Sequence, residues 1–155
     1  MNFPDTSFLC ALYRPQWNSD QADAYCDKLK SPLPVSTLVL FEFRQSTRLQ
    51  VRLRRSDRRL GFRKAQGAGM MELLKEDLDS GFLAPTPVDW SAVHTLAELL
   101  SAKYTEKAGH RFADILHVAT ALQLSAQTFL TFDANQASLA KAEGLKVPFR
   151  MKFGS

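Results

Sequence analysis

Four acidic residues stand at positions where a carboxylate is better suited to chemistry than to packing. Asp5 directly follows a short strand-like run at residues 1–4, and Asp133 follows another at residues 128–132. Each precedes a stretch of helix formers, and the ligands of an open α/β sheet bind outside the carboxyl ends of its strands. Taken singly, each aspartate is also explained as an N-cap, because its oxygens satisfy free backbone N–H groups and the helix dipole.

Glu42 breaks the apolar pattern of the helix that is expected to contain it, over residues 38–54. On that helix Glu42 shares a face with Leu38, Val39, Leu49 and Leu53. A buried charge without a partner is strongly destabilising, so Glu42 is expected to have a partner.

Asp114 repeats this anomaly on a helix expected over residues 112–124. It lines up with His117, Val118 and Ala121, although its place in the first turn also suits a plain interaction with the helix dipole. His117 is near enough in sequence to be considered as a catalytic base, but a packed histidine is the favoured interpretation. Arg111, one turn earlier, is expected to contact either the Asp114 carboxylate or a substrate phosphate.

These four carboxylates are predicted to converge on one site. Two such charges about 4 Å apart repel by about 4 kcal/mol even at a surface-like dielectric, and only protons or a divalent cation relieve that repulsion. Oxygen ligands favour Mg²⁺ or Mn²⁺ over zinc, and the chain has no Cys/His spacing typical of a zinc site.

Short apolar runs alternate with longer helical stretches along the chain. Strands are expected near residues 1–4, 32–36, 81–85 and 128–132, with a further strand possible at 146–149. Helices are expected at residues 8–13, 19–30, 38–54, 58–79, 90–107, 112–124 and 134–143. Such alternation predicts an α/β fold with parallel strands. No linker or internal repeat divides the chain, so residues 1–155 are expected to form a single domain.

The net charge of +4 hides a strong segregation. Residues 44–64 hold nine basic residues and one acid, a net charge of +8, which leaves −4 for the rest of the chain. A polyanion such as nucleic acid is one partner that suits this segment, and a solvated helix is the other interpretation. Two cysteines, no signal-peptide layout and no apolar run of about 20 residues together favour a cytoplasmic protein without membrane association.

Several of these residues occur in segments that together resemble the PIN domain, and more narrowly the VapC-type toxins of bacterial type II toxin–antitoxin systems. The segments are MNFPDTSFL at residues 1–9, FEF at 41–43, RFADILHVATA at 111–121, FLTFD at 129–133 and LAKAEGL at 139–145. The resemblance implies a PIN-like three-layer sandwich with a short, mainly parallel central sheet flanked by helices. It is strongest from Asp114 to Leu145.

The resemblance also implies a divalent-metal-dependent endoribonuclease that hydrolyses RNA phosphodiester bonds. Its catalytic acids correspond to Asp5, Glu42, Asp114 and Asp133. Asp5, Asp114 and Asp133 are expected to bind the metal, Mg²⁺ with Mn²⁺ as a substitute, while Glu42 either binds metal or orients water. Ser7 and Thr131 are expected to orient a ligand or water. Many relatives place another acid or Asn shortly after the last aspartate, where this chain has Asn135 and Gln136 and so lacks a fifth carboxylate.

The partners implied by the resemblance are an RNA substrate, a cognate antitoxin and a second copy of the chain in a homodimer. Four arginines lie opposite Glu42 on a helical wheel, and these are Arg44, Arg48, Arg52 and Arg55. They are expected to meet RNA phosphates, an acidic antitoxin segment or only solvent. The alternative to the nuclease is a non-catalytic PIN-like scaffold that binds RNA or protein.

Overall fold

The computed structural model describes residues 1–150, so residues 151–155 of the predicted domain lie outside the described range. Its centre is made of two parallel strand pairs. Strand β1 (Asn2–Pro4) pairs with β4 (Thr128–Leu130), and β2 (Leu33–Val35) pairs with β3 (Leu83–Pro85). Because β1 and β2 also lie in contact, the spatial order of the strands is β3-β2-β1-β4.

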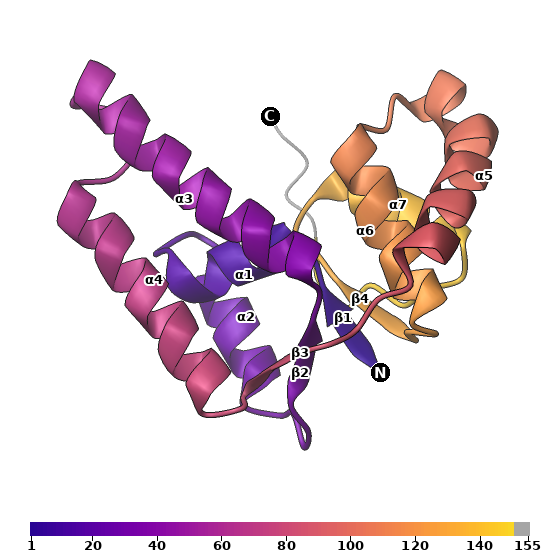
Figure 1. Ribbon diagram of the computed structural model, residues 1–155, viewed down its shortest axis with the longest axis horizontal. Coiled ribbons are helices and arrows are strands. Elements are labelled where there is room, and N and C mark those ends of the chain that lie inside the picture. Colours follow the sequence, from indigo (N-terminus) through magenta and orange to yellow (C-terminus); the bar gives the residue numbers. More distant parts are fainter. Residues whose placement is uncertain (151–155) are drawn as a thin grey trace.

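Helices cover this centre on both sides, as Figure 1 shows. One group consists of α1 (Thr6–Tyr13), α2 (Ser19–Cys26), α3 (Thr37–Ser56) and α4 (Lys64–Asp79). The other group consists of α5 (Trp90–Ala108), α6 (Phe112–Gln123) and α7 (Ala134–Ala142). The strands lie between the two groups, so the predicted α/β fold with a short parallel sheet flanked by helices is confirmed.

The core lies where the strands meet the first turns of the helices. Phe3 of β1 and Phe129 of β4 are fully buried, and their rings stack with centroids 6.5 Å apart. Phe8 of α1 is also fully buried and stacks on Phe132. Strands that are covered on both faces need apolar residues in succession, and these short runs supply them. The carboxyl ends of β1 and β4 are thereby held next to each other.

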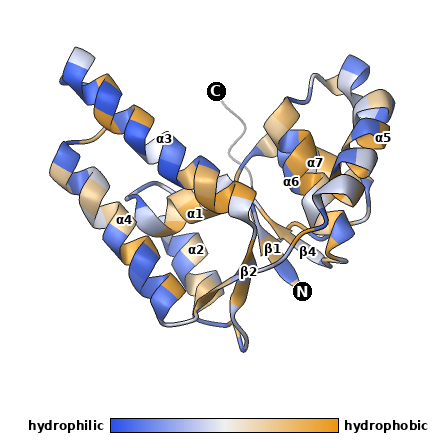
Figure 2. Ribbon diagram, viewed as in Figure 1, coloured by the Kyte–Doolittle hydropathy of each residue, from blue (hydrophilic) through white to orange (hydrophobic). Residues whose placement is uncertain are grey.

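The second half of α3 departs from the prediction. Val39, Leu40, Phe43 and Thr47 are buried, whereas Leu49 and Leu53 are about half exposed, so the expected apolar stripe through Leu49 and Leu53 is wrong. Figure 1 shows α3 running past the strands, and Figure 2 shows its far end as largely hydrophilic. That half of α3 lies beside α4, where Gly67 faces Val51, and Leu49 and Leu53 are not among the buried core residues.

The segment between α3 and α4 is longer than the sequence pattern suggests, since α4 begins at Lys64 and not at residue 58. Gly61 makes this turn possible. It has φ of +61°, and a Cβ at this position would lie 1.9 Å from the Gln50 carbonyl oxygen. Only glycine allows the chain to fold back this closely onto α3.

Two other element boundaries also differ. Helix α2 ends at Cys26 instead of residue 30, because the chain turns at once through hydrogen bonds from Lys28 N to Tyr25 O and from Leu29 N to Cys26 O. The strand considered at residues 146–149 is reduced to one parallel bridge between Lys146 and Thr128. Pro148 has no N–H group with which to extend that pairing.

Cys10 and Cys26 are free thiols. Burial raises the pKa of Cys10 to about 11 and that of Cys26 to about 12, so both stay protonated at neutral pH and act as packing residues. Within residues 1–150, none of the helices combines the length and apolar character needed to span a bilayer.

Candidate active site

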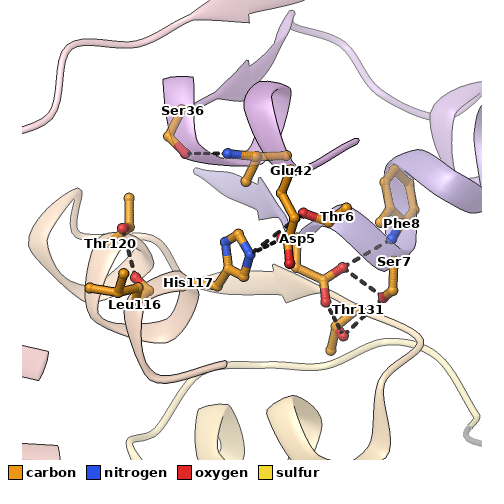
Figure 3. Close-up of polar contacts among 11 residues, drawn as sticks. Asp5, Thr6, Ser7, Phe8, Ser36, Glu42, Leu116, His117, Thr120 and Thr131 are labelled. Carbon is orange, nitrogen blue, oxygen red and sulfur yellow. Dashed lines mark hydrogen bonds and ion pairs between the residues drawn. The ribbon is translucent and has the colours of Figure 1, made fainter. Parts of the chain in front are cut away.

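Asp5 is held by hydrogen bonds at the carboxyl ends of β1 and β4, and its side chain is fully buried (Figure 3). Its Oδ1 accepts from Ser7 Oγ at 2.7 Å and from the Phe8 backbone N–H at 2.9 Å. Its Oδ2 accepts from Thr131 Oγ1 at 2.6 Å. The carboxylate is therefore oriented through both oxygens, and it caps α1 as well.

Ser7 and Thr131 also connect Asp5 to the segment that follows β4. Ser7 Oγ accepts from the Phe132 N–H at 2.8 Å, and Thr131 Oγ1 accepts from the Asp133 N–H at 3.0 Å. The two residues that were expected to support the site thus join the strand end carrying Asp5 to the strand end carrying Asp133.

Burial raises the pKa of Asp5 from 3.8 to about 6, although the charge of His117 and the hydrogen bonds from Thr131, Ser7 and Phe8 oppose this rise. Desolvation disfavours the charged form of a carboxyl group. A cation beside Asp5 would favour that charged form and keep the carboxylate ionised.

Glu42 reaches the same region from the first half of α3, and there it finds the partner that its position requires. Its Oε2 accepts a hydrogen bond from Thr6 Oγ1 and lies 2.5 Å from His117 Nε2. Burial opposes ionisation of Glu42, but the hydrogen bond and charge of His117, together with Thr6, keep its pKa below the usual value.

Asp114 and Asp133 both cap helices. Asp114 is 6% exposed, and its Oδ2 accepts from the Arg111 backbone N–H at 3.1 Å. Asp133 is partly buried, and its Oδ1 accepts from Asn135 N at 2.8 Å and from Gln136 N at 2.9 Å. The N-cap role expected as the alternative for Asp133 is confirmed, since Asp133 caps α7. For Asp114 only an interaction with the helix dipole was expected, and the structure adds the hydrogen bond from the Arg111 N–H, which stands at the N-cap of α6.

Capping leaves part of each carboxylate available. Within residues 1–150, no hydrogen bond reaches Asp114 Oδ1, Asp133 Oδ2 or Glu42 Oε1. Three carboxylates therefore keep one whole oxygen each for a ligand. Asp5 keeps one acceptor position on Oδ2, which accepts a single hydrogen bond.

The described residues do not form a closed metal cage. Among residues 1–150, no three His, Cys, Asp or Glu side chains lie close enough to bind one ion together. Mg²⁺ is usually held by one or two carboxylates, with waters and substrate phosphates completing its octahedron. Asp114 and Asp133 each keep one free oxygen, which is the kind of ligand that an ion bound in this hydrated way requires.

Asp5, Glu42, Asp114 and Asp133, with the side chains that hold them, are called the carboxylate cluster below. The arginines and lysines of residues 1–150 form no ion pair with it. Arg111 is exposed, and only its backbone N–H contacts Asp114, while its guanidinium pairs with no carboxylate of residues 1–150. Helix α3 ends at Ser56, so Arg59 and Arg63 do not extend the arginine row, and Arg59 pairs with Asp57 instead. The four arginines of the row, Arg44, Arg48, Arg52 and Arg55, likewise form no ion pair within the described part of the chain.

Two residues of the cluster were not predicted to belong to it. Thr6 was not singled out, and His117 was interpreted as a packed histidine. His117 is indeed fully buried, but its Nε2 faces Glu42 and its Nδ1 has no hydrogen-bond partner (Figure 3). The available signals were the position of Thr6 beside Asp5 and the spacing of His117 one turn after Asp114.

The raised pKa of Asp5 predicts a pH dependence of stability. Because the folded state binds this proton more tightly than the unfolded state, the contribution of Asp5 to stability is greatest below pH 3.8 and falls as pH rises through about 6. The whole loss amounts to about 3 kcal/mol. Urea unfolding in EDTA should therefore show Asp5→Asn gaining stability relative to the wild type between about pH 4.5 and about pH 7.5. Parallel stability profiles for the two proteins would contradict the shift.

A family model of the PIN domain matches residues 3–142. The chain belongs to the PIN domain family. The resemblance inferred from the sequence is therefore confirmed, and Asp5 and Asp133 of this PIN domain follow the carboxyl ends of its paired parallel strands β1 and β4. No curated protein matches the sequence significantly.

Solved structures share the fold of this PIN domain over nearly their whole length. VapC20 of Mycobacterium tuberculosis, described as a sarcin–ricin loop cleaving toxin, is 18% identical with a TM-score of 0.66, covering 95% of this chain and 98% of that chain. FitAcB of Neisseria gonorrhoeae is 22% identical with a TM-score of 0.61, covering 95% and 96%. VapBC2 of Rickettsia felis, bound to a promoter DNA fragment, is 13% identical with a TM-score of 0.60, covering 94% and 96%. At these identities the likeness establishes a common fold.

Proposed function

We propose that this PIN domain is a divalent-metal-dependent endoribonuclease and the toxin of a toxin–antitoxin pair. The observation that carries the proposal is the buried Asp5, which Thr131 links to Asp133, together with free carboxylate oxygens on Glu42, Asp114 and Asp133. The shared fold with a toxin that cleaves the sarcin–ricin loop supports RNA as the substrate class. The single domain is taken to comprise residues 1–155.

Asp5, Asp114 and Asp133 would hold the metal, with Mg²⁺ as the expected ion and Mn²⁺ as a substitute, because all three offer only oxygen. When bound, such an ion supplies charge neutralisation at the phosphate and lowers the pKa of a bound water. Glu42 remains ionised because of His117 and Thr6, so its free Oε1 can accept a proton from an attacking water. Ser7 and Thr131 hold Asp5 in place.

The arginine row gives the protein a long-range attraction for RNA. The unpaired guanidinium groups on α3 raise the local concentration of a polyanion, and this effect weakens as salt is added. The row lies away from Glu42, so it would contact RNA beyond the cleaved phosphate. Arg111 lies next to the cluster and would contact a phosphate near it.

We also infer a cognate antitoxin as a protein partner, since a structure of similar fold is the VapBC2 complex. A homodimer and a cytoplasmic site of action belong to the same proposal. Both suit a toxin that is silenced by its partner and acts on cellular RNA.

The test is RNA cleavage by the purified protein with Mg²⁺ or Mn²⁺ and with EDTA. We expect cleavage of structured RNAs only with the divalent ion, and recovery of cleavage when excess Mg²⁺ is added to the EDTA sample. Electrophoretic separation of end-labelled RNA measures both. RNA binding without cleavage under every metal condition would contradict the nuclease and support the non-catalytic scaffold instead. Equal cleavage in EDTA would contradict metal dependence.

A further inference from the structure

A cavity of about 300 Å³ lies between α5 and α6, and the site described above does not use it. The apolar part of the cavity wall is formed by Ala97, Ile115 and Leu116. The polar part is formed by Ser101, Thr105 and His110. Leu116 lies about 200° and Ile115 about 100° around α6 from Asp114, because successive residues of a helix are about 100° apart. The cavity and Asp114 therefore lie on different faces of the same helix.

His110 brings an unsatisfied polar group to this cavity. Its side chain is 7% exposed, and its Nδ1 is buried without a hydrogen-bond partner. Buried polar atoms in folded proteins are nearly always paired. Ser101 adds a second unused donor, since its hydroxyl accepts from Thr105 at 3.3 Å and donates to no other group of residues 1–150.

Phe112 lines the same cavity and is 76% exposed, the largest exposed fraction among the exposed large hydrophobic side chains of the described chain. It is the first residue of α6, with the exposed Arg111 before it and Asp114 two residues after it. Packing does not account for an aromatic ring left so open. A planar ligand that stacks on the ring would account for it.

We infer that this cavity binds one unstacked base of the RNA substrate, and this inference rests on the proposed nuclease function. Sequence-specific proteins recognise single-stranded RNA by stacking splayed bases on aromatic rings and by hydrogen bonding to their edges. Phe112 supplies the ring, and His110 and Ser101 supply hydrogen-bonding groups. The Glu98 carboxylate, which also lines the cavity, accepts from an exocyclic amino group, so the cavity selects bases that carry one.

The position of the cavity agrees with an RNA strand that passes the end of α6. A helix with its side chains is about 10–12 Å wide, so a base in the cavity belongs to a nucleotide close to the phosphate at Asp114. Arg111 stands between the two and can bind the connecting phosphate. A metal ion does not fit as the occupant, because no three ligating side chains among residues 1–150 share an ion-sized space.

The test measures binding in EDTA, where cleavage does not interfere. Fluorescence anisotropy with labelled single-stranded oligoadenylate, oligocytidylate and oligouridylate should show that the two amino-bearing sequences bind more tightly than oligouridylate. Phe112→Ala should weaken their binding about 5- to 100-fold, the range expected for loss of one stacked base. Phe112→Trp should restore binding, and Glu98→Gln should reduce the preference over oligouridylate. Leu99→Ala, an exposed change on α5 outside the cavity, should leave affinity unchanged.

Unchanged affinity and base preference in Phe112→Ala would overturn the inference. So would a change in the oligomeric state of that variant in size-exclusion chromatography without a change in RNA affinity, since a second copy of the chain would then cover Phe112. The proposed function fails separately, if the wild type cleaves no RNA with any divalent ion. In that case the binding experiment still decides the base site.

Discussion

Replacing either Asp5 or Asp114 by asparagine is expected to lower metal-dependent RNA cleavage by about 10³-fold. Both changes keep the size of the side chain and remove its negative charge. In Asp114→Asn, the position of the free oxygen is taken either by the amide nitrogen, which does not bind a cation, or by the neutral amide oxygen, which binds a cation more weakly than a carboxylate oxygen does. Initial cleavage rates with Mg²⁺ or Mn²⁺, measured on the same RNA, give the comparison.

The fold is expected to survive both substitutions. In Asp5→Asn the amide oxygen still accepts from Ser7 and from the Phe8 N–H, and the amide nitrogen can donate to Thr131 Oγ1. Asp89→Asn is the matched control, because Asp89 caps α5 by accepting from Ala92 N and asparagine is an equally good cap. Cleavage by Asp5→Asn or Asp114→Asn at the rate of Asp89→Asn would remove these acids from the catalytic set.

Removing the His117 imidazole is expected to reduce cleavage about 10- to 100-fold, the usual effect of losing a group that orients a catalytic carboxylate. In His117→Leu, Glu42 keeps Thr6 as a partner but loses the group that lies 2.5 Å from its Oε2. Burial then dominates, so the pKa of Glu42 rises. The acid limb of the pH–rate profile should move to higher pH.

His117→Gln separates this role from simple packing. The glutamine amide can still donate to Glu42, so this variant should recover part of the rate and move the acid limb back towards that of the wild type. Substitution of His117 should lower kcat more than it changes KM, because His117 is fully buried and does not contact RNA directly. An acid limb at the same pH in the wild type and in His117→Leu would show that His117 serves packing alone.

Glu42 illustrates what the local sequence pattern can and cannot predict about the site. The helix pattern around it predicted correctly that the carboxylate needs a partner, because a charge within an apolar stripe is costly. It did not identify His117, which lies 75 positions away on α6 and reaches Glu42 only in the folded chain. The same pattern was wrong about Leu49 and Leu53, which are about half exposed. Burial of a helix face depends on which other elements pack against that part of the helix, and the local pattern does not contain this information.

Asp114 and Asp133 show the opposite case. The N-cap role of Asp133 could be inferred from position alone, since an aspartate directly before a helix accepts from N–H groups of its first turn in any fold. For Asp114, in the first turn itself, position alone predicted an interaction with the helix dipole. Which of their oxygens stays free depends on the hydrogen bonds from Arg111, Asn135 and Gln136, and the structure was needed to show it.

By itself, the amino-acid sequence determined the alternation of short strands and helices, the placement of Asp5 and Asp133 at strand ends, and the basic segment at residues 44–64. These features follow from periodicity, capping and charge, which act between near neighbours in the chain. Only the tertiary structure decided that Thr6 and His117 hold Glu42, that Ser7 and Thr131 hold Asp5, and that α3 runs beyond the core. Those contacts join distant segments, and they form only when the parallel strands bring their carboxyl ends together.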